Sequence, residues 1–217
     1  MNYATRAIVT TLSVVFGISG MNHGLFETLQ GNTPTDGMFI SAIGDAQRMW
    51  PHGNEPAFTL IPNFLWTGIA AMLVGLAIII WSVGFVHKKN GPIILLALFV
   101  LLLLVGGGVA QILFFPWICL VSTQINSSLL RWRKIFPARI QAPFGKLWLG
   151  NLLLGSTILL FVLEIATTGF IPAVNNPQTV ISVMLLCLAA EVVILPFTIL
   201  SGFAHDVSMM SVTPATS

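Results

Sequence analysis

The 217-residue sequence has very few charged residues. Only 7% of the residues are Asp, Glu, Lys or Arg, whereas 56% are hydrophobic, and the mean hydropathy is +0.92. Soluble domains carry about 25% charged residues, so this composition excludes a water-facing surface over the whole chain. The net charge of +2 is small and no basic, aromatic surface pattern is present, so nucleic acid is not expected as a partner.

Cysteines and metal-binding motifs are also scarce. The two cysteines, Cys119 and Cys187, both fall inside apolar segments and lack metal-ligand spacing, so we expect buried small side chains. Neither an HExxH nor a CxxC motif occurs. The sequence therefore predicts no metal site and shows no complete catalytic constellation.

Long apolar segments dominate what is present: residues 7–30, 59–86, 92–122, 147–172 and 179–203. Each exceeds the roughly 18 residues that mark a spanning helix. The first follows a basic residue as a secretory signal does, but no A-x-A-like site follows, and we expect it to be retained. With no repeat and no low-complexity stretch, the sequence predicts a single integral membrane domain, 1–217. Its predicted fold is an all-α, polytopic transmembrane helical bundle with about five spanning helices and one long polar loop, 31–58.

Two topologies compete for the segment 92–122. If all five segments cross, three basic residues (Arg6, Lys88, Lys89) lie on the N-terminal side, and six lie opposite: Arg48, Arg131, Arg133, Lys134, Arg139 and Lys146. If 92–122 instead turns back at the glycines 106–108, the division becomes eight to one. We predict five crossings, because residues 93–113 alone are long enough to cross and re-entrant backbone is the rarer solution. Orientation stays open, since the positive-inside rule and the external character of loop 31–58 conflict.

Ionisable side chains inside apolar segments mark function by default. A stripe of small residues at helical spacing leads to Glu27: Ser13, Gly17, Gly20 and Gly24. Such stripes pack against another helix, so we expect Glu27, and His23 one turn before it, to face the bundle interior. Glu191 falls near the midplane, and Glu164 falls toward the N-terminal side if five segments cross.

The five-crossing topology gathers polar residues on the side opposite the N-terminus. The candidate pocket consists of His23, Glu27, Asn63, Gln111, Glu191 and His205, and the loop candidates are Asp36, Asp45, His52 and Glu55. The His23–Glu27 spacing fits a proton-carrying pair, two metal ligands or a structural interhelical hydrogen bond. Glu191 fits a proton or cation relay, or equally a protonated carboxyl bonded to a neighbouring helix.

These features leave three classes of function. We predict a non-catalytic integral membrane protein, an accessory or structural subunit of a larger membrane assembly, with lipid and other membrane subunits or further copies as partners. The first alternative is a small proton or solute transporter or channel that uses Glu191, Glu27 and His23. The second is a membrane enzyme with a His/Glu pocket. Bound lipid is the expected cofactor. A lone histidine in a span can also ligate haem or a pigment, whereas a bis-histidine haem would require matching depths, which His23 and His205 lack.

Overall fold

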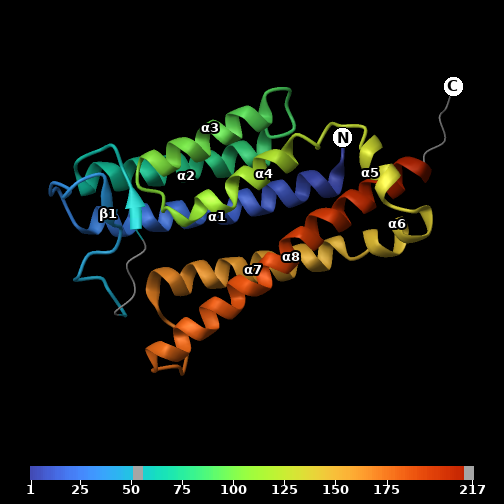
Figure 1. Cartoon of the computed structure of the whole chain (residues 1–217). Coiled ribbons are helices and arrows are strands. Elements are labelled where there is room, and N and C mark those ends of the chain that lie inside the picture. The colour runs from blue at the N-terminus through green and yellow to red at the C-terminus, as the bar shows by residue number, and fades with distance from the viewer. Residues whose placement is uncertain (51–55, 213–217) are drawn as a thin grey trace.

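The computed structural model describes residues 1–50 and 56–212 and is an all-α helical bundle, which confirms the predicted fold class (Figure 1). Its helices are α1 (Tyr3–Leu29), α2 (Phe64–Gly84), α3 (Gly91–Leu104), the 3-10 helix η1 (Ala110–Leu113), α4 (Phe115–Ser122), α5 (Leu130–Ile135), α6 (Ala138–Gly145), α7 (Trp148–Thr168) and α8 (Pro177–Val212). Two short strands, β1 (Phe39–Ser41) and β2 (Pro56–Phe58), pair antiparallel, with Phe39 opposite Phe58.

Four of these helices, α1, α2, α7 and α8, are long and apolar enough to cross a membrane. Large aliphatic side chains cover their outer surfaces; Leu186 and Val192 on α8 are 71% and 75% exposed. Aliphatic surfaces of this kind suit hydrocarbon rather than water. Helices can also lie in hydrocarbon because they satisfy their backbone hydrogen bonds internally. The chain thus has the helices of a multi-pass membrane protein.

Helix α1 occupies the middle of the bundle, and α2 runs antiparallel along it (Figure 1). Glycines bring the two backbones together: a side-chain carbon on Gly17 would lie 2.9 Å from the carbonyl oxygen of Gly75, and one on Gly24 would meet that of Gly68. Gly20 packs instead against Leu102 of α3. The small-residue stripe therefore faces protein, as its spacing predicted.

The segment 92–122 does not form one long helix, and the prediction that it crosses was wrong. Helix α3 ends at Leu104, the backbone turns at 105–109, and η1 and α4 run back toward the start of α3. At the end of this return, the backbone amide of Asn2 donates to the carbonyl of Ile125, and the side-chain amide of Asn126 donates to the carbonyl of His87, both at 2.7 Å. Residues 125 and 126 thus lie beside the start of α1 and the end of α2.

The positive φ angles that glycine tolerates, and hydrogen bonds to β2, explain why the helix breaks there. Gly106 and Gly108 have φ angles of +101° and +88°, a region that other residues rarely adopt. Backbone groups of the turn are satisfied by protein: Gly106 donates to the carbonyl of Phe58 at 2.9 Å, and Val109 donates to that of Pro56 at 3.1 Å. Non-helical backbone within a bundle is tolerated where protein buries it in this way.

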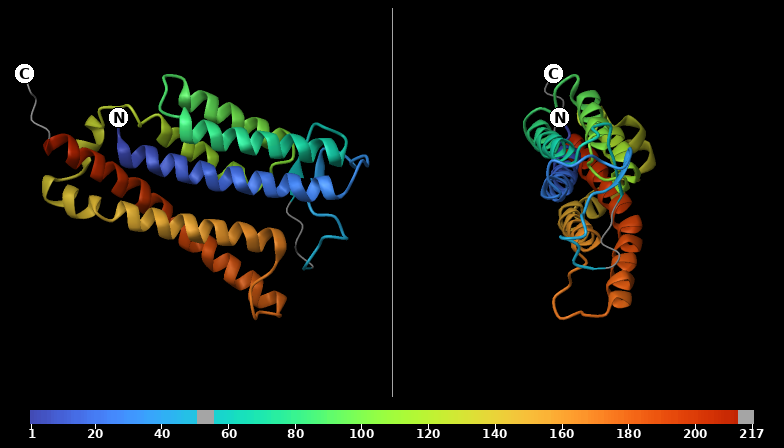
Figure 2. Two further views of the ribbon diagram at one scale, coloured as in Figure 1. Left: turned by 180° about the vertical axis from the view of Figure 1, so that it is seen from behind. Right: turned by 90° about the vertical axis from the view of Figure 1, so that its left-hand side faces the viewer.

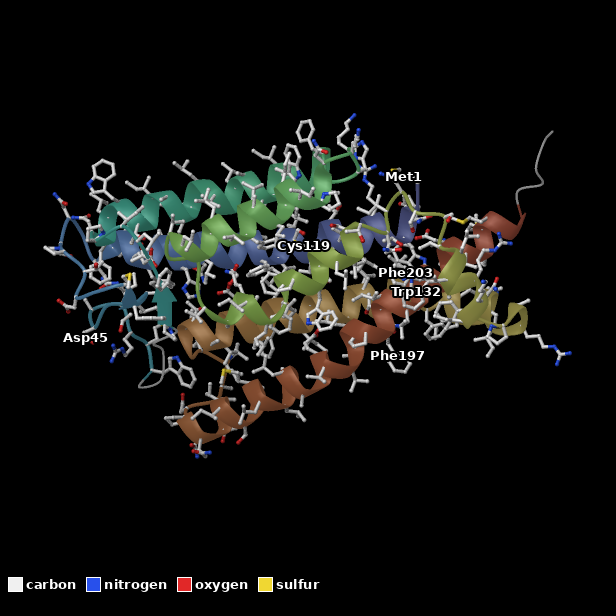
Figure 3. All side chains as sticks on the ribbon, turned by 45° about the horizontal axis from the view of Figure 1, so that its top comes forward. Met1, Asp45, Cys119, Trp132, Phe197 and Phe203 are labelled. Carbon is white, nitrogen blue, oxygen red and sulfur yellow. The ribbon has the colours of Figure 1, made fainter. Side chains whose placement is uncertain are left out.

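The hairpin reverses the direction predicted for every later helix. Helix α7 starts beside the N-terminus, where the rings of Tyr3 and Trp148 lie 6.2 Å apart, and α8 returns to the same place. We call this the basic end, because eight of the nine Lys and Arg residues lie there: Arg6, Lys88, Lys89, Arg131, Arg133, Lys134, Arg139 and Lys146. The polar loop lies at the opposite end, which we call the loop end (Figure 2), and the ninth basic residue, Arg48, pairs there with Asp45, which Figure 3 labels.

Candidate functional site

At the loop end, His23 and Glu27 on the last turns of α1 are both buried, with exposures of 1% and 0%. The glycine turn of the hairpin lies directly against them. A side-chain carbon on Gly106 would collide with the Glu27 carboxyl oxygens, and one on Gly108 would lie 2.9 Å from Nε2 of His23. The absence of side chains in this turn therefore creates the space that the two polar groups fill.

The carboxyl group of Glu27 has an unusual environment. Within the described residues, neither of its oxygens has a hydrogen-bond partner. Burying a polar group without such a partner costs free energy, and intramembrane ionisable groups that persist despite this cost are candidates for binding or proton transfer. The buried carboxyl of Glu27 is therefore a candidate for ligand binding or proton transfer.

Glu164 of α7 joins His23 from the other side. The side-chain amide of Asn22 lies 3.5 Å from both Glu164 oxygens, and His23 is near enough to interact electrostatically with the same carboxyl. The expectation that Glu164 lies toward the N-terminal side was wrong, because α7 runs toward the loop end. Sequence reasoning did not include this residue in the site; the eight-to-one topology would have placed it there.

The side chains of Asn63 and Gln111 bond to neighbouring loop and helix groups, and none of these hydrogen bonds is to Glu27 or Glu164. The Asn63 side chain caps α2 by accepting from the Trp66 amide at 3.3 Å, and it donates to Asn32 at 2.8 Å. Gln111 is 4% exposed and donates to the carbonyl of Gly107. Gln111 therefore holds the glycine turn that lies over His23 and Glu27.

The remaining polar candidates lie elsewhere. His205 is at the basic end, 5.5 Å from the Trp148 ring, so the expectation that it shares a side with His23 was wrong. The two histidines cannot hold one haem, because they lie at opposite ends.

The loop candidates make no shared site with His23 and Glu27 among the described residues. Asp36 and Asp45 are exposed, and Asp45 pairs with Arg48 at 2.9 Å; His52 and Glu55 lie outside the described residues. Among the described residues, no three His, Cys, Asp or Glu side chains are arranged to hold a metal.

Glu191 marks a second site, separate from the first. It is 1% exposed, and its oxygens have no hydrogen-bond partner among the described residues. It lines a cavity of about 1020 Å³ between α8 and α1, η1, α4 and α5. The other walls are largely apolar, including Leu12, Phe16 and Leu195. We call this space the α8 cavity.

The α8 cavity extends from the middle of the bundle to the basic end. On α8 its lining runs from Glu191 to Phe203, which is roughly 18 Å at about 1.5 Å per residue. At its basic end, Trp132 of α5 packs on Phe203 with ring centroids 4.6 Å apart (Figure 3). Polar groups gather at this end of the lining: Gln124, Ser127, Ser128 and Arg131.

The helices and their apolar surfaces define the class, a helical bundle with the characteristics of a multi-pass membrane protein. Comparison with protein-family models, curated proteins and solved structures finds no match. The functional argument therefore rests on the two sites.

Proposed function

We propose that the chain is a non-catalytic integral membrane protein that binds lipid in the α8 cavity and acts as an accessory subunit of a membrane assembly. The observation that carries this proposal is the cavity itself, about 1020 Å³ of space with predominantly apolar walls. Ligand sites generally have volumes of about 300–1,000 Å³ and mostly apolar linings. The cavity is thus large enough for a substantial part of a lipid.

The lining of the cavity favours an apolar occupant over water. Water needs two to four polar partners in a cavity, and polar lining is concentrated at the basic end. Hydrocarbon therefore fits the apolar part of the cavity better than water does.

The cavity also reaches the surface that faces lipid. Three of its lining residues are strongly exposed: Trp117 at 65%, Leu130 at 60% and Val192 at 75%. A lipid in the surrounding bilayer therefore has a lateral route into the cavity. Apolar walls around Glu191 argue for a dry site, which favours a subunit over a water-lined transport path.

Adjacent valines on α8 provide a matched test of lipid binding. Val192 lines the cavity, whereas Val193 does not, although it is also exposed. We expect Val192→Trp to fill the cavity mouth and remove most of the lipid that stays with the wild type through mild-detergent purification. Val193→Trp should retain it. Mass spectrometry of lipid extracted per mole of protein measures the difference; equal lipid in all three proteins would refute the proposal.

Proton or cation transport is the second candidate, and the buried, unpartnered carboxyl of Glu27 favours it. On this proposal, purified protein in liposomes conducts protons or small cations, and Glu27→Gln abolishes the flux. The Asp36→Asn control, in the exposed loop, leaves it unchanged. An ion-flux assay in liposomes with a pH-sensitive dye measures this transport. The absence of flux under several pH and ion gradients would contradict this candidate.

A further inference from the structure

The basic end carries an unbalanced positive charge. Its eight Lys and Arg residues face a single described acidic side chain, Asp206, which is 4% exposed and already accepts hydrogen bonds from the amides of Ala4 and Thr5. The pKa of His87 is lowered there, first by burial and then by the positive charges of Arg6 and Lys88. An anion bound at this end therefore meets a favourable field.

Arg131 is the basic residue that brings this charge to the α8 cavity. It lies on the first turn of α5 and lines the cavity together with Gln124 and Ser127, whereas Arg133 on the same helix does not. Helix α5 is fixed at this position because Trp132 packs on Phe203 of α8. The cavity thus combines a long apolar wall with Arg131, an exposed basic residue, at one end.

The length of the cavity corresponds to one leaflet. Its roughly 18 Å from the level of Phe203 to Glu191 compares with about 15 Å for half of a 30 Å hydrocarbon core. A molecule with its polar group at Arg131 would therefore end its hydrocarbon chain near Glu191. The length of the cavity and the position of Arg131 therefore match those of a lipid in the leaflet at the basic end.

We propose that the α8 cavity selects an anionic phospholipid, whose phosphate is bound by Arg131 and whose acyl chain lies along α8 toward Glu191. This proposal rests on the proposed function and adds the chemical class of the ligand. Guanidinium groups bind phosphate oxygens through paired hydrogen bonds, and basic pockets between membrane helices bind anionic head groups. The net charge of the head group then distinguishes this ligand from a zwitterionic lipid.

The two arginines of α5 provide the matched test. The full chain is reconstituted in vesicles of equal phosphatidylglycerol and phosphatidylcholine, re-extracted in mild detergent, and its retained lipids are quantified. We expect about fivefold enrichment of phosphatidylglycerol for the wild type, equivalent to about 1 kcal/mol. Arg131→Gln should reduce the ratio to near one while total lipid stays similar, and Arg133→Gln should keep the enrichment.

The outcomes separate the head-group proposal from lipid binding itself. Enrichment that survives Arg131→Gln, or that Arg133→Gln removes equally, overturns the role of Arg131 but leaves lipid binding intact. Lipid retention that Val192→Trp does not change overturns the cavity as the site. If Arg131→Gln does not yield monodisperse protein, a salt series on the wild type replaces it: enrichment should fall as salt screens the charges, and a salt-independent ratio overturns the proposal.

Discussion

A single carboxylate connects the two ends of the chain. Asp206 on α8 accepts hydrogen bonds from the backbone amides of Ala4 and Thr5 at 2.9 and 2.8 Å, and from the Thr5 hydroxyl at 2.6 Å. The first amides of a helix have no partner within the helix, and a negative charge there interacts favourably with the helix dipole. Asp206 therefore supplies to α1 the capping group that Asn2 does not provide from its side chain.

Removing this carboxylate should destabilise the bundle. We expect Asp206→Ala to lower the free energy of unfolding by about 2–3 kcal/mol, because buried amides of α1 lose a charged acceptor. Thermal unfolding in detergent, followed by circular dichroism, measures the change. Asp36→Ala in the exposed loop is the control and should leave the midpoint unchanged. Equal midpoints for Asp206→Ala and the wild type would show that the cap contributes little.

Among the elements, the α3–α4 hairpin determines the positions of the others. The sequence analysis identified the glycines 106–108 as a possible turn, yet it favoured a crossing because 93–113 is long and apolar enough. That length criterion counts apolar residues and does not register backbone partners. The turn is stabilised by hydrogen bonds from Gly106 and Val109 to residues of β2. Those residues lie about 50 positions earlier in the chain. Such long-range pairing has no signature in local composition.

The glycine turn gives a prediction of its own. Gly106→Ala should destabilise the fold by at least about 1 kcal/mol, because alanine is strained at φ +101° and its side-chain carbon would collide with the Glu27 carboxyl. Gly150→Ala is the matched control: this helical glycine has open space around it, and alanine there should be neutral or stabilising. Unfolding midpoints of both variants in detergent measure the difference, and similar midpoints would contradict the described turn.

At the scale of the whole molecule, the sequence predicted more of the fold than of the site. Composition was enough for an all-α membrane bundle, and the glycine spacing in α1 correctly predicted that His23 and Glu27 are buried. The misplacement of Glu164 and His205 followed from one error, since a reversed hairpin changes the direction of every later helix. The α8 cavity was beyond prediction, because it depends on how α5 and α8 pack, and neither helix shows this in its own residues.

The same hairpin leads to a prediction of membrane orientation. With eight of nine Lys and Arg residues at one end, the positive-inside rule places the basic end, and with it the start of α1 and the end of α8, on the cytoplasmic side. Single cysteines in a variant that lacks Cys119 and Cys187 test this in intact cells with a membrane-impermeant maleimide. Asp36→Cys should be labelled, whereas Lys89→Cys should react only after the cells are opened.

Arg139→Cys distinguishes the hairpin from the five-crossing topology. It lies on α6, at the same end as Lys89 in the structure, so we expect both cysteines to be protected in intact cells and labelled after permeabilisation. With five crossings, Arg139→Cys would instead react together with Asp36→Cys. Labelling of Lys89→Cys and Arg139→Cys but not Asp36→Cys would keep the hairpin and reverse the orientation, which would show that the charge asymmetry does not control insertion of this chain.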